Sequence, residues 1–169
     1  NNLLGVTLVM ADGTVLELGG AHLDSAGYDL VGLVCGSEGQ LGVVTEATVR
    51  ILPLAEGARP VLFGFASSEA AGACVAEVLG NGIVPVAIEF MDKPAIEITE
   101  SFAHAGYPLD AEAMLIVEVE GSDEEMDAAL ARIIEIARRH DVQTIKESRS
   151  ATETAQIWKG RKSAFGATG

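Results

Sequence analysis

The first third of the chain alternates short apolar runs with glycine-rich turns. Leu4–Met10 and Val15–Leu18 are rich in β-forming residues and enclose an Asp-Gly pair, a combination typical of a β-hairpin. A further strand is predicted for Val43–Leu52, in which alternate residues face opposite sides of a sheet. The apolar run Tyr28–Cys35 fits either a buried helical turn or a strand, because its length does not distinguish the two.

A different pattern, in which strands alternate with amphipathic helices, follows an expected linker at residues 55–59. The predicted strands are Val61–Ala66, Val86–Met91, Ala113–Glu120 and Val142–Lys146. Helices are predicted to begin after Ser67, at Pro94 and after Ser122, where Ser122 and Glu125 form a capping box. The order β-α-β followed by β-α-β, with one inserted helical stretch, is the ferredoxin-like split βαβ arrangement. We therefore predict an α+β fold, with a four-stranded antiparallel sheet over residues 60–147 covered by helices on one face.

Within the second of these strands, the alternation predicts that Val86, Ile88 and Phe90 face inward and that Glu89 faces the opposite side. A last helix is predicted for Ala151–Phe165, because Ser150 and Glu153 have the spacing of another capping box.

The stretch Gly36-Ser37-Glu38-Gly39-Gln40-Leu41-Gly42-Val43 contains three glycines within seven residues, between an apolar run and a β-branched run. Such a loop presents bare backbone N–H groups to a polar or anionic ligand, or it simply connects two elements. It lacks the G-x-x-x-x-G-K-[ST] pattern of a P-loop and the G-x-G-x-x-G pattern of a Rossmann turn. Spacing alone leaves both interpretations open.

The predicted last helix carries Trp158, Arg161, Lys162 and Phe165 at positions i, i+3, i+4 and i+7 of one face. A guanidinium held beside an indole is suited to binding a carboxylate. Alternatively, the two aromatic residues pack in the core while the cations extend to solvent or pair with surface acids.

The charge balance narrows the choice of ligands. The formal net charge is −14, with 25 acidic and 11 basic residues, which disfavours nucleic acid and anionic membranes as partners. A small anionic ligand remains compatible, because a local Arg or Lys dominates at short range. No apolar segment approaches the roughly 20 residues needed to cross a bilayer, so no transmembrane segment is predicted. The N-terminal stretch does not have the pattern of a signal peptide.

The cysteines and histidines give no metal or redox signature. Cys35 and Cys74 lie in apolar stretches without a C-x-x-C motif, and we interpret them as buried, reduced thiols of a cytoplasmic protein. The three histidines are scattered, so no metal site is predicted. The first and last residues suggest a piece of a longer protein.

Several segments resemble a known family, the FAD-linked oxidases of the vanillyl-alcohol oxidase type. The resemblance rests on segments 2–13 and 28–33, on G-S-E-G-Q-L-G followed by V-V-T-E-A-T in 36–48, on Glu89–Asp92, and on Trp158–Lys162. It points in particular to the members that oxidise D-2-hydroxy acids, namely the glycolate oxidase FAD subunit, D-lactate dehydrogenase and D-2-hydroxyglutarate dehydrogenase.

The resemblance implies that residues 1–54 are the C-terminal part of a two-subdomain FAD-binding domain and that 60–169 are the first part of the substrate domain. It implies contacts to FAD from Gly36, Ser37, Glu38, Gly39, Gly42 and Val43. It also implies a substrate-binding role for Arg161, with Lys162 and Trp158 beside it. No catalytic base and no metal ligand are expected within the chain.

The implied activity is oxidation of a D-2-hydroxy acid such as glycolate or D-lactate to the 2-oxo acid, with FAD as the hydride acceptor. The 169-residue piece by itself is expected to bind no FAD and to be inactive. Partner subunits of an oxidase complex and a homodimer are further expectations. The alternative is a non-catalytic ferredoxin-like module that binds a ligand or another subunit.

Overall fold

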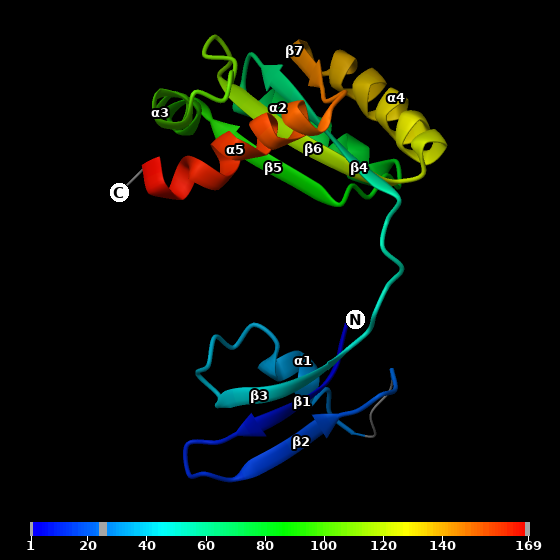
Figure 1. Ribbon diagram of the computed structural model, residues 1–169, viewed down its shortest axis with the longest axis vertical. Helices are drawn as coiled ribbons and strands as arrows, with labels where there is room; N and C mark the ends of the chain where they lie inside the picture. The colour runs from blue at the N-terminus through cyan, green and yellow to red at the C-terminus, as the bar shows by residue number, and fades with distance from the viewer. Residues whose placement is uncertain (1, 24–26, 168–169) are drawn as a thin grey trace. The chain divides into compact units, whose positions relative to one another are not determined.

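The computed structural model describes residues 2–23 and 27–167. The chain forms two compact units, Asn1–Leu54 and Ala55–Gly169 (Figure 1), and each is described by itself.

The first unit is a three-stranded antiparallel sheet with one short helix. Its elements are β1 (Leu3–Val9), β2 (Val15–Gly19), α1 (Leu30–Val34) and β3 (Val43–Val49), and the strand order is β2-β1-β3. The predicted hairpin is confirmed: the Asp12 carboxylate accepts a hydrogen bond from the Thr14 backbone N–H at 2.9 Å. The apolar run whose structure the sequence left open is helical, and Asp29 caps it by accepting from the Gly32 N–H at 2.8 Å.

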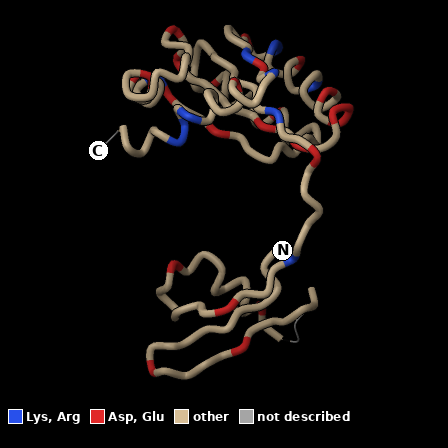
Figure 2. Tube along the Cα trace, in the orientation of Figure 1, with Lys and Arg blue, Asp and Glu red and all other residues tan. Residues whose placement is uncertain are grey.

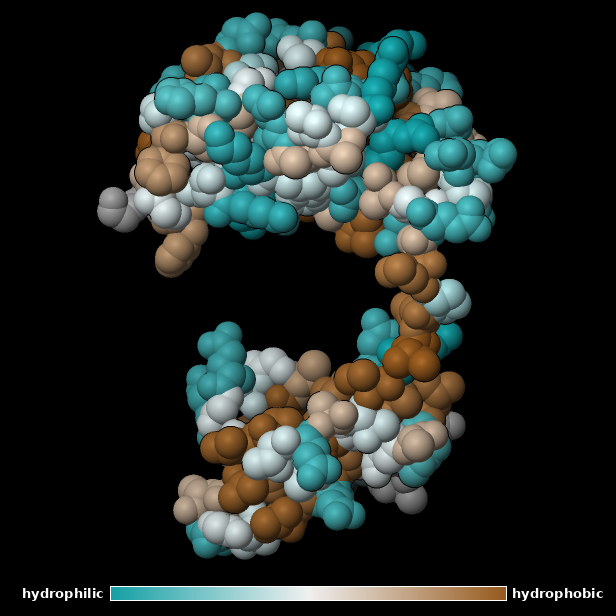
Figure 3. Space-filling model, in the orientation of Figure 1, coloured by the Kyte–Doolittle hydropathy of each residue, from teal (hydrophilic) through white to brown (hydrophobic). Residues whose placement is uncertain are grey.

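This first unit buries few side chains. Its core cluster consists of Val6, Leu8 and Val34, whereas every residue of β3 is exposed. The strand ends at Val49, three residues before the predicted end. Figure 3 shows hydrophobic side chains exposed over this unit. Val15, Val43 and Ile51 are each more than half exposed. A sheet of this kind lacks the covering layer that a stable domain normally has.

The second unit has the predicted ferredoxin-like sheet. Its elements are β4 (Gly57–Phe65), α2 (Ser68–Gly80), β5 (Ala87–Asp92), α3 (Lys93–Ala103), β6 (Ala113–Gly121), α4 (Asp123–Arg139), β7 (Val142–Glu147) and α5 (Ala151–Ala167). The strand order is β5-β6-β4-β7, and all neighbours are antiparallel. The Ser122–Glu125 capping box begins α4 as predicted. Acids gather at the start of α4 and arginines at its end (Figure 2), which suits the helix dipole.

Helices cover both faces of this sheet, so the prediction of helices on one face is wrong. Helices α2 and α4 pack on the face formed by Phe63, Leu115 and their neighbours, whereas α3 and α5 pack on the face formed by Leu62 and Ile116. The physical reason lies in β6, whose residues 113–117 are all buried and all apolar. A central strand of that composition requires cover on both sides.

Three smaller expectations are also corrected. β4 begins at Gly57, so most of the predicted linker at 55–59 belongs to a strand. Cys74 is buried as expected, but Cys35 is exposed because it follows α1 in the thinly covered first unit. Phe90, which was predicted to face inward, is 47% exposed, because β5 is an edge strand of the sheet.

Candidate functional site

Helix α5, which carries the predicted substrate-binding residues, begins at Ala151. The Ser150 hydroxyl accepts a hydrogen bond from the Glu153 N–H at 3.2 Å, as a cap should. The reciprocal half of the predicted capping box is absent, because the Glu153 carboxylate accepts from the Arg149 N–H at 2.7 Å instead. The helix packs against α3 and buries Ile157 completely.

Tyr107 attaches the middle of α5 to the rest of the unit. Its hydroxyl donates a hydrogen bond to the Ile157 carbonyl oxygen at 2.6 Å. Gly160 makes this approach possible, because a Cβ there would lie 2.3 Å from Cζ of the Tyr107 ring. Burial raises the pKa of Tyr107 to about 12, although the backbone N–H of Arg161 acts in the opposite direction. The phenol therefore lies against the helical turn that bears Arg161.

The loop that carries Tyr107 is itself held by Glu100 of α3. The Glu100 carboxylate accepts hydrogen bonds from the backbone N–H groups of Ala105, Gly106 and Tyr107 at 2.9, 3.1 and 3.0 Å. His104, which precedes these residues, ends α3 in the left-handed conformation with φ 48°. Three donors on one carboxylate fix the loop, and the loop in turn fixes the position of Tyr107.

Arg161 lies on the sheet side of α5, where it meets an acid of β5. Its Nε donates a hydrogen bond to the Glu89 carboxylate at 2.8 Å. The Arg161 side chain is 41% exposed and the Glu89 side chain 33% exposed. Within the described part of the chain, neither Nη1 nor Nη2 of Arg161 donates a hydrogen bond to another residue. This edge of the guanidinium is therefore available to an anion.

Trp158 makes a parallel contact one turn earlier. Its indole N–H donates to the Glu118 carboxylate on β6 at 2.8 Å, and its ring packs against the core of this face. Since Ala87 pairs with Glu118 and Glu89 pairs with Ile116, the two carboxylates are diagonal neighbours on one sheet face. Two acids of the sheet thus receive two donors of α5 that are three residues apart.

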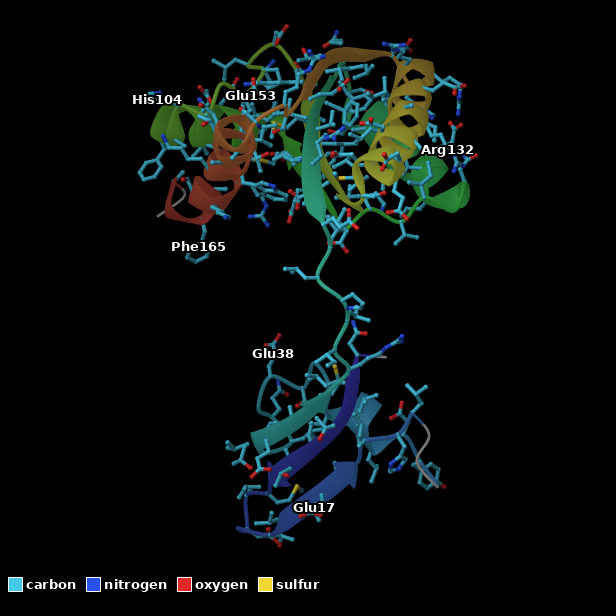
Figure 4. All side chains as sticks on the ribbon, turned by 45° about the vertical axis from the view of Figure 1, so that its right-hand side comes forward. Glu17, Glu38, His104, Arg132, Glu153 and Phe165 are labelled. Atoms are coloured by element: carbon cyan, nitrogen blue, oxygen red, sulfur yellow. The ribbon has the colours of Figure 1, made fainter. Side chains whose placement is uncertain are left out.

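Lys162 lies in a different environment from Arg161. It lines a cleft of about 740 Å³ together with Trp158, Arg59, Arg149 and Glu147, whereas Arg161 does not line this cleft. Phe165 is 91% exposed at the end of α5 and points away from the unit (Figure 4). The four residues predicted to share one face of α5 therefore have different surroundings. Arg161 contacts Glu89, Lys162 lines the cleft, and Trp158 both contacts Glu118 and lines the cleft. Phe165 does not pack in the core.

The glycine-rich loop of the first unit is open and rich in left-handed backbone. Glu38 and Gly39 have φ values of 51° and 79°, and the Glu38 side chain points away from the sheet (Figure 4). Among the described residues, the backbone N–H groups of Gly36, Gly39 and Gly42 have no hydrogen-bond partner. Gly42 cannot be replaced easily, since a Cβ there would lie 2.7 Å from the Val9 carbonyl oxygen. Ser37 and Val43 flank these donors. Free N–H groups of this kind fit the polar atoms of a nucleotide cofactor.

Sequence reasoning did not assign a role to Glu89, Glu118, Tyr107 or Gly160. Two signals in the sequence pointed to them. A glycine inside a predicted helix often marks a close contact. An acid in a predicted strand lies on the same face as the residues two positions away, which for Glu89 include Met91 and for Glu118 include Ile116. Neither signal indicates which residue is contacted, because partners such as Tyr107 and Ile157 are 50 positions apart in the chain.

In the described residues, no cluster of His, Cys, Asp or Glu is suited to hold a metal ion. None of the helices described here is long and apolar enough to cross a membrane.

Comparison with known proteins identifies the family. The profile described as "FAD linked oxidases, C-terminal domain" matches residues 55–169. The whole chain is 41% identical to the glycolate oxidase subunit GlcD of Escherichia coli, covering 34% of that protein. A D-lactate dehydrogenase of Archaeoglobus fulgidus is 37% identical over 76% of this chain and 29% of its own length.

The fold matches an alkyldihydroxyacetonephosphate synthase structure with a TM-score of 0.68 and 16% identity, over 99% of this chain and 32% of that one. The chain thus spans about a third of the length of these relatives. Since the family profile covers more than half of its residues, the chain belongs to the FAD-linked oxidases.

Proposed function

We propose that the whole protein is an FAD-dependent enzyme that oxidises a small D-2-hydroxy acid, such as glycolate or D-lactate, to the 2-oxo acid. The observation that carries the proposal is the Arg161 guanidinium, which is anchored through Nε by Glu89 while Nη1 and Nη2 donate to no other residue that the structure describes. A carboxylate accepts two parallel hydrogen bonds from such an edge. The similarity to GlcD and to a D-lactate dehydrogenase supports a hydroxy acid as the ligand.

When bound, FAD supplies the acceptor for the hydride that leaves the substrate α-carbon. The role of this chain is to bind and to orient. Arg161 holds the substrate carboxylate, and the positive charge of Lys162 on the same helix favours the approach of an anion. In the first unit, the backbone N–H groups of Gly36, Gly39 and Gly42, which have no partner among the described residues, would hydrogen-bond polar atoms of FAD, with Ser37, Glu38 and Val43 beside them.

The domain assignment follows from this proposal. The unit Asn1–Leu54 is the C-terminal part of an FAD-binding domain, and Ala55–Gly169 belongs to the substrate domain. The 169-residue chain alone is expected to bind no FAD. Flavin absorbance that purifies with this chain would contradict that expectation.

The test uses the whole protein, purified with FAD. Under anaerobic conditions, glycolate or D-lactate should bleach the flavin band, whereas L-lactate should not. Replacing Arg161→Ala should raise KM for the reactive hydroxy acid by about 100-fold, because the hydrogen bonds to the carboxylate are lost. Arg138→Ala is the matched control, since Arg138 is an exposed arginine of α4 on the opposite face of the sheet.

An unchanged KM in Arg161→Ala would remove the carboxylate role, and absence of flavin reduction by any 2-hydroxy acid would remove the proposed activity. In the latter case the non-catalytic binding module becomes the better interpretation.

We also propose that the whole protein works with partner subunits, because the relative GlcD is named as a subunit. The exposed hydrophobic residues of the first unit would be covered by other protein, and a homodimer of this chain is one way to cover them. A monomeric mass of the 169-residue chain by light scattering would exclude the homodimer. A cytoplasmic location stays a prediction that cell fractionation can test.

A further inference from the structure

Glu89 holds Arg161 from a rigid part of the fold. It lies in the middle of β5, which pairs with β6 over all six residues from Ala87 to Asp92. Glu89 shares its sheet face with the buried Met91, and two thirds of its side chain is shielded from solvent. The neighbouring acid Glu118 is occupied by the Trp158 indole, which leaves Glu89 to Arg161.

The point of attachment on the guanidinium is informative. A guanidinium offers two edges for paired hydrogen bonds, one formed by Nε and an Nη, the other formed by Nη1 and Nη2. Glu89 receives its hydrogen bond from Nε. The edge formed by Nη1 and Nη2 is therefore left for a second carboxylate. The hydrogen bond from Nε also restrains rotation of the guanidinium about the Arg161 side chain.

The backbone of Arg161 is held as well. The Tyr107 hydroxyl donates to the Ile157 carbonyl, one turn before Arg161, and Gly160 lies against the Tyr107 ring. Both ends of a long side chain are thus fixed, the backbone by Tyr107 and the guanidinium by Glu89. A flexible arginine would lose much more rotational freedom when it binds an anion.

On this basis we propose that Glu89 is a positioning residue that orients the Arg161 guanidinium for the substrate carboxylate. This inference rests on the proposed function of Arg161. A purely stabilising ion pair is the weaker explanation, because a pair this exposed contributes little to stability in water. Glu89 touches Arg161 and is not expected to bind the substrate itself.

Glu89 could act on Arg161 by orienting its guanidinium or only through its negative charge, and the two explanations predict opposite changes in KM when Glu89 is replaced. If Glu89 acts only through its negative charge, its removal should strengthen the attraction of Arg161 for the substrate anion and lower KM. If it orients the guanidinium, its removal should raise KM. Glu89→Gln separates the two effects further, because the Gln carbonyl oxygen still accepts from Nε while the charge is gone.

The experiment is a double-mutant cycle in the whole flavin-containing protein, with KM and kcat measured for the hydroxy acid that reduces the flavin. Glu89→Ala should raise KM about 10-fold with a smaller change in kcat, and Glu89→Gln should restore most of the affinity. In the Arg161→Ala background, Glu89→Ala should have no further effect on KM, because the residue acts through Arg161.

Glu135→Ala is the control, since Glu135 pairs with Arg139 at 2.9 Å on the opposite face of the sheet. It should leave KM unchanged. Far-ultraviolet circular dichroism and the flavin spectrum verify that each variant is folded and loaded.

A KM within twofold of the parent in Glu89→Ala, or a lowered KM, would overturn the inference. An added KM effect of Glu89→Ala in the Arg161→Ala background would also overturn it, because a structural role does not depend on Arg161. These results are distinct from failure of the proposed function, in which Arg161→Ala itself would leave KM unchanged.

Discussion

The hydroxyl of Tyr107 donates a hydrogen bond to the carbonyl oxygen of Ile157, 50 residues later in the chain, at 2.6 Å. This contact joins the loop after α3 to the helix that carries Trp158, Arg161 and Lys162. It positions α5 together with the hydrogen bonds from Trp158 to Glu118 and from Arg161 to Glu89, and the close packing of Gly160 beside Tyr107 can be tested directly.

Replacing Gly160→Ala should destabilise the second unit by about 1–3 kcal/mol, because the new Cβ would lie 2.3 Å from the Tyr107 ring. The effect opposes the helix propensity of alanine, which by itself favours the variant by about 1 kcal/mol. Urea unfolding followed by the fluorescence of the single tryptophan, Trp158, measures the change. Gly72→Ala in α2 is the control, because nothing lies within 4 Å of a Cβ there. A stabilised Gly160→Ala variant would contradict the packing.

Tyr107→Phe should cost about 1–2 kcal/mol at neutral pH, through loss of the hydrogen bond to Ile157. The same substitution should change how the free energy of unfolding falls with pH in alkaline solution. The pKa of Tyr107 is raised to about 12 in the folded state, from an ordinary value of 10.0, so the folded state holds this proton more tightly. Its contribution is present below pH 10 and is lost as the pH rises towards 12. Unfolding free energies between pH 9 and 12 should therefore fall less steeply in Tyr107→Phe, and equal slopes would count against this account.

The loss of stability in acid should depend in part on Glu77. Hydrogen bonds from Arg139 and then His140 lower the pKa of the Glu77 carboxyl below its ordinary value of 4.5. A lowered pKa means that the ionised carboxylate is favoured in the folded state, so this contribution is present above pH 4.5 and is lost as the pH falls. Glu77→Gln should be less stable than the parent at pH 7, and the difference should shrink towards pH 3. A difference that stays constant with pH would show that the ion pairs are not its cause.

The two cysteines should react at very different rates in the 169-residue chain. Cys35 is exposed, whereas Cys74 is buried and burial raises its pKa to about 11, so its thiolate is scarce at pH 8. Iodoacetamide labelling, read peptide by peptide in a mass spectrometer, should modify Cys35 first. Both thiols should react alike in urea, and rapid labelling of Cys74 without urea would contradict its burial.

Local signals in the sequence predicted most of the elements. The Asp-Gly hairpin, the caps of α2 and α4 and the strand alternation all depend on residues within a few positions of one another. The covering of both sheet faces was missed, although the unbroken apolar run of β6 contained the signal. Its meaning depends on which helices cover the second face, and one of the two, α5, begins 30 residues after β6 ends.

At the candidate site, local sequence patterns identified a glycine-rich loop and a helix with a tryptophan and two cations. Helical spacing placed Trp158, Arg161 and Lys162 within one turn. The contact of Arg161 with Glu89, and the separate cleft that Lys162 lines, became visible only in the folded chain. The physical reason is that helical periodicity fixes a residue's angle on its own helix, whereas its partner depends on how that helix rests on the sheet. Here Tyr107, Gly160 and two strand carboxylates set that position, and they come from parts of the chain that no local pattern connects.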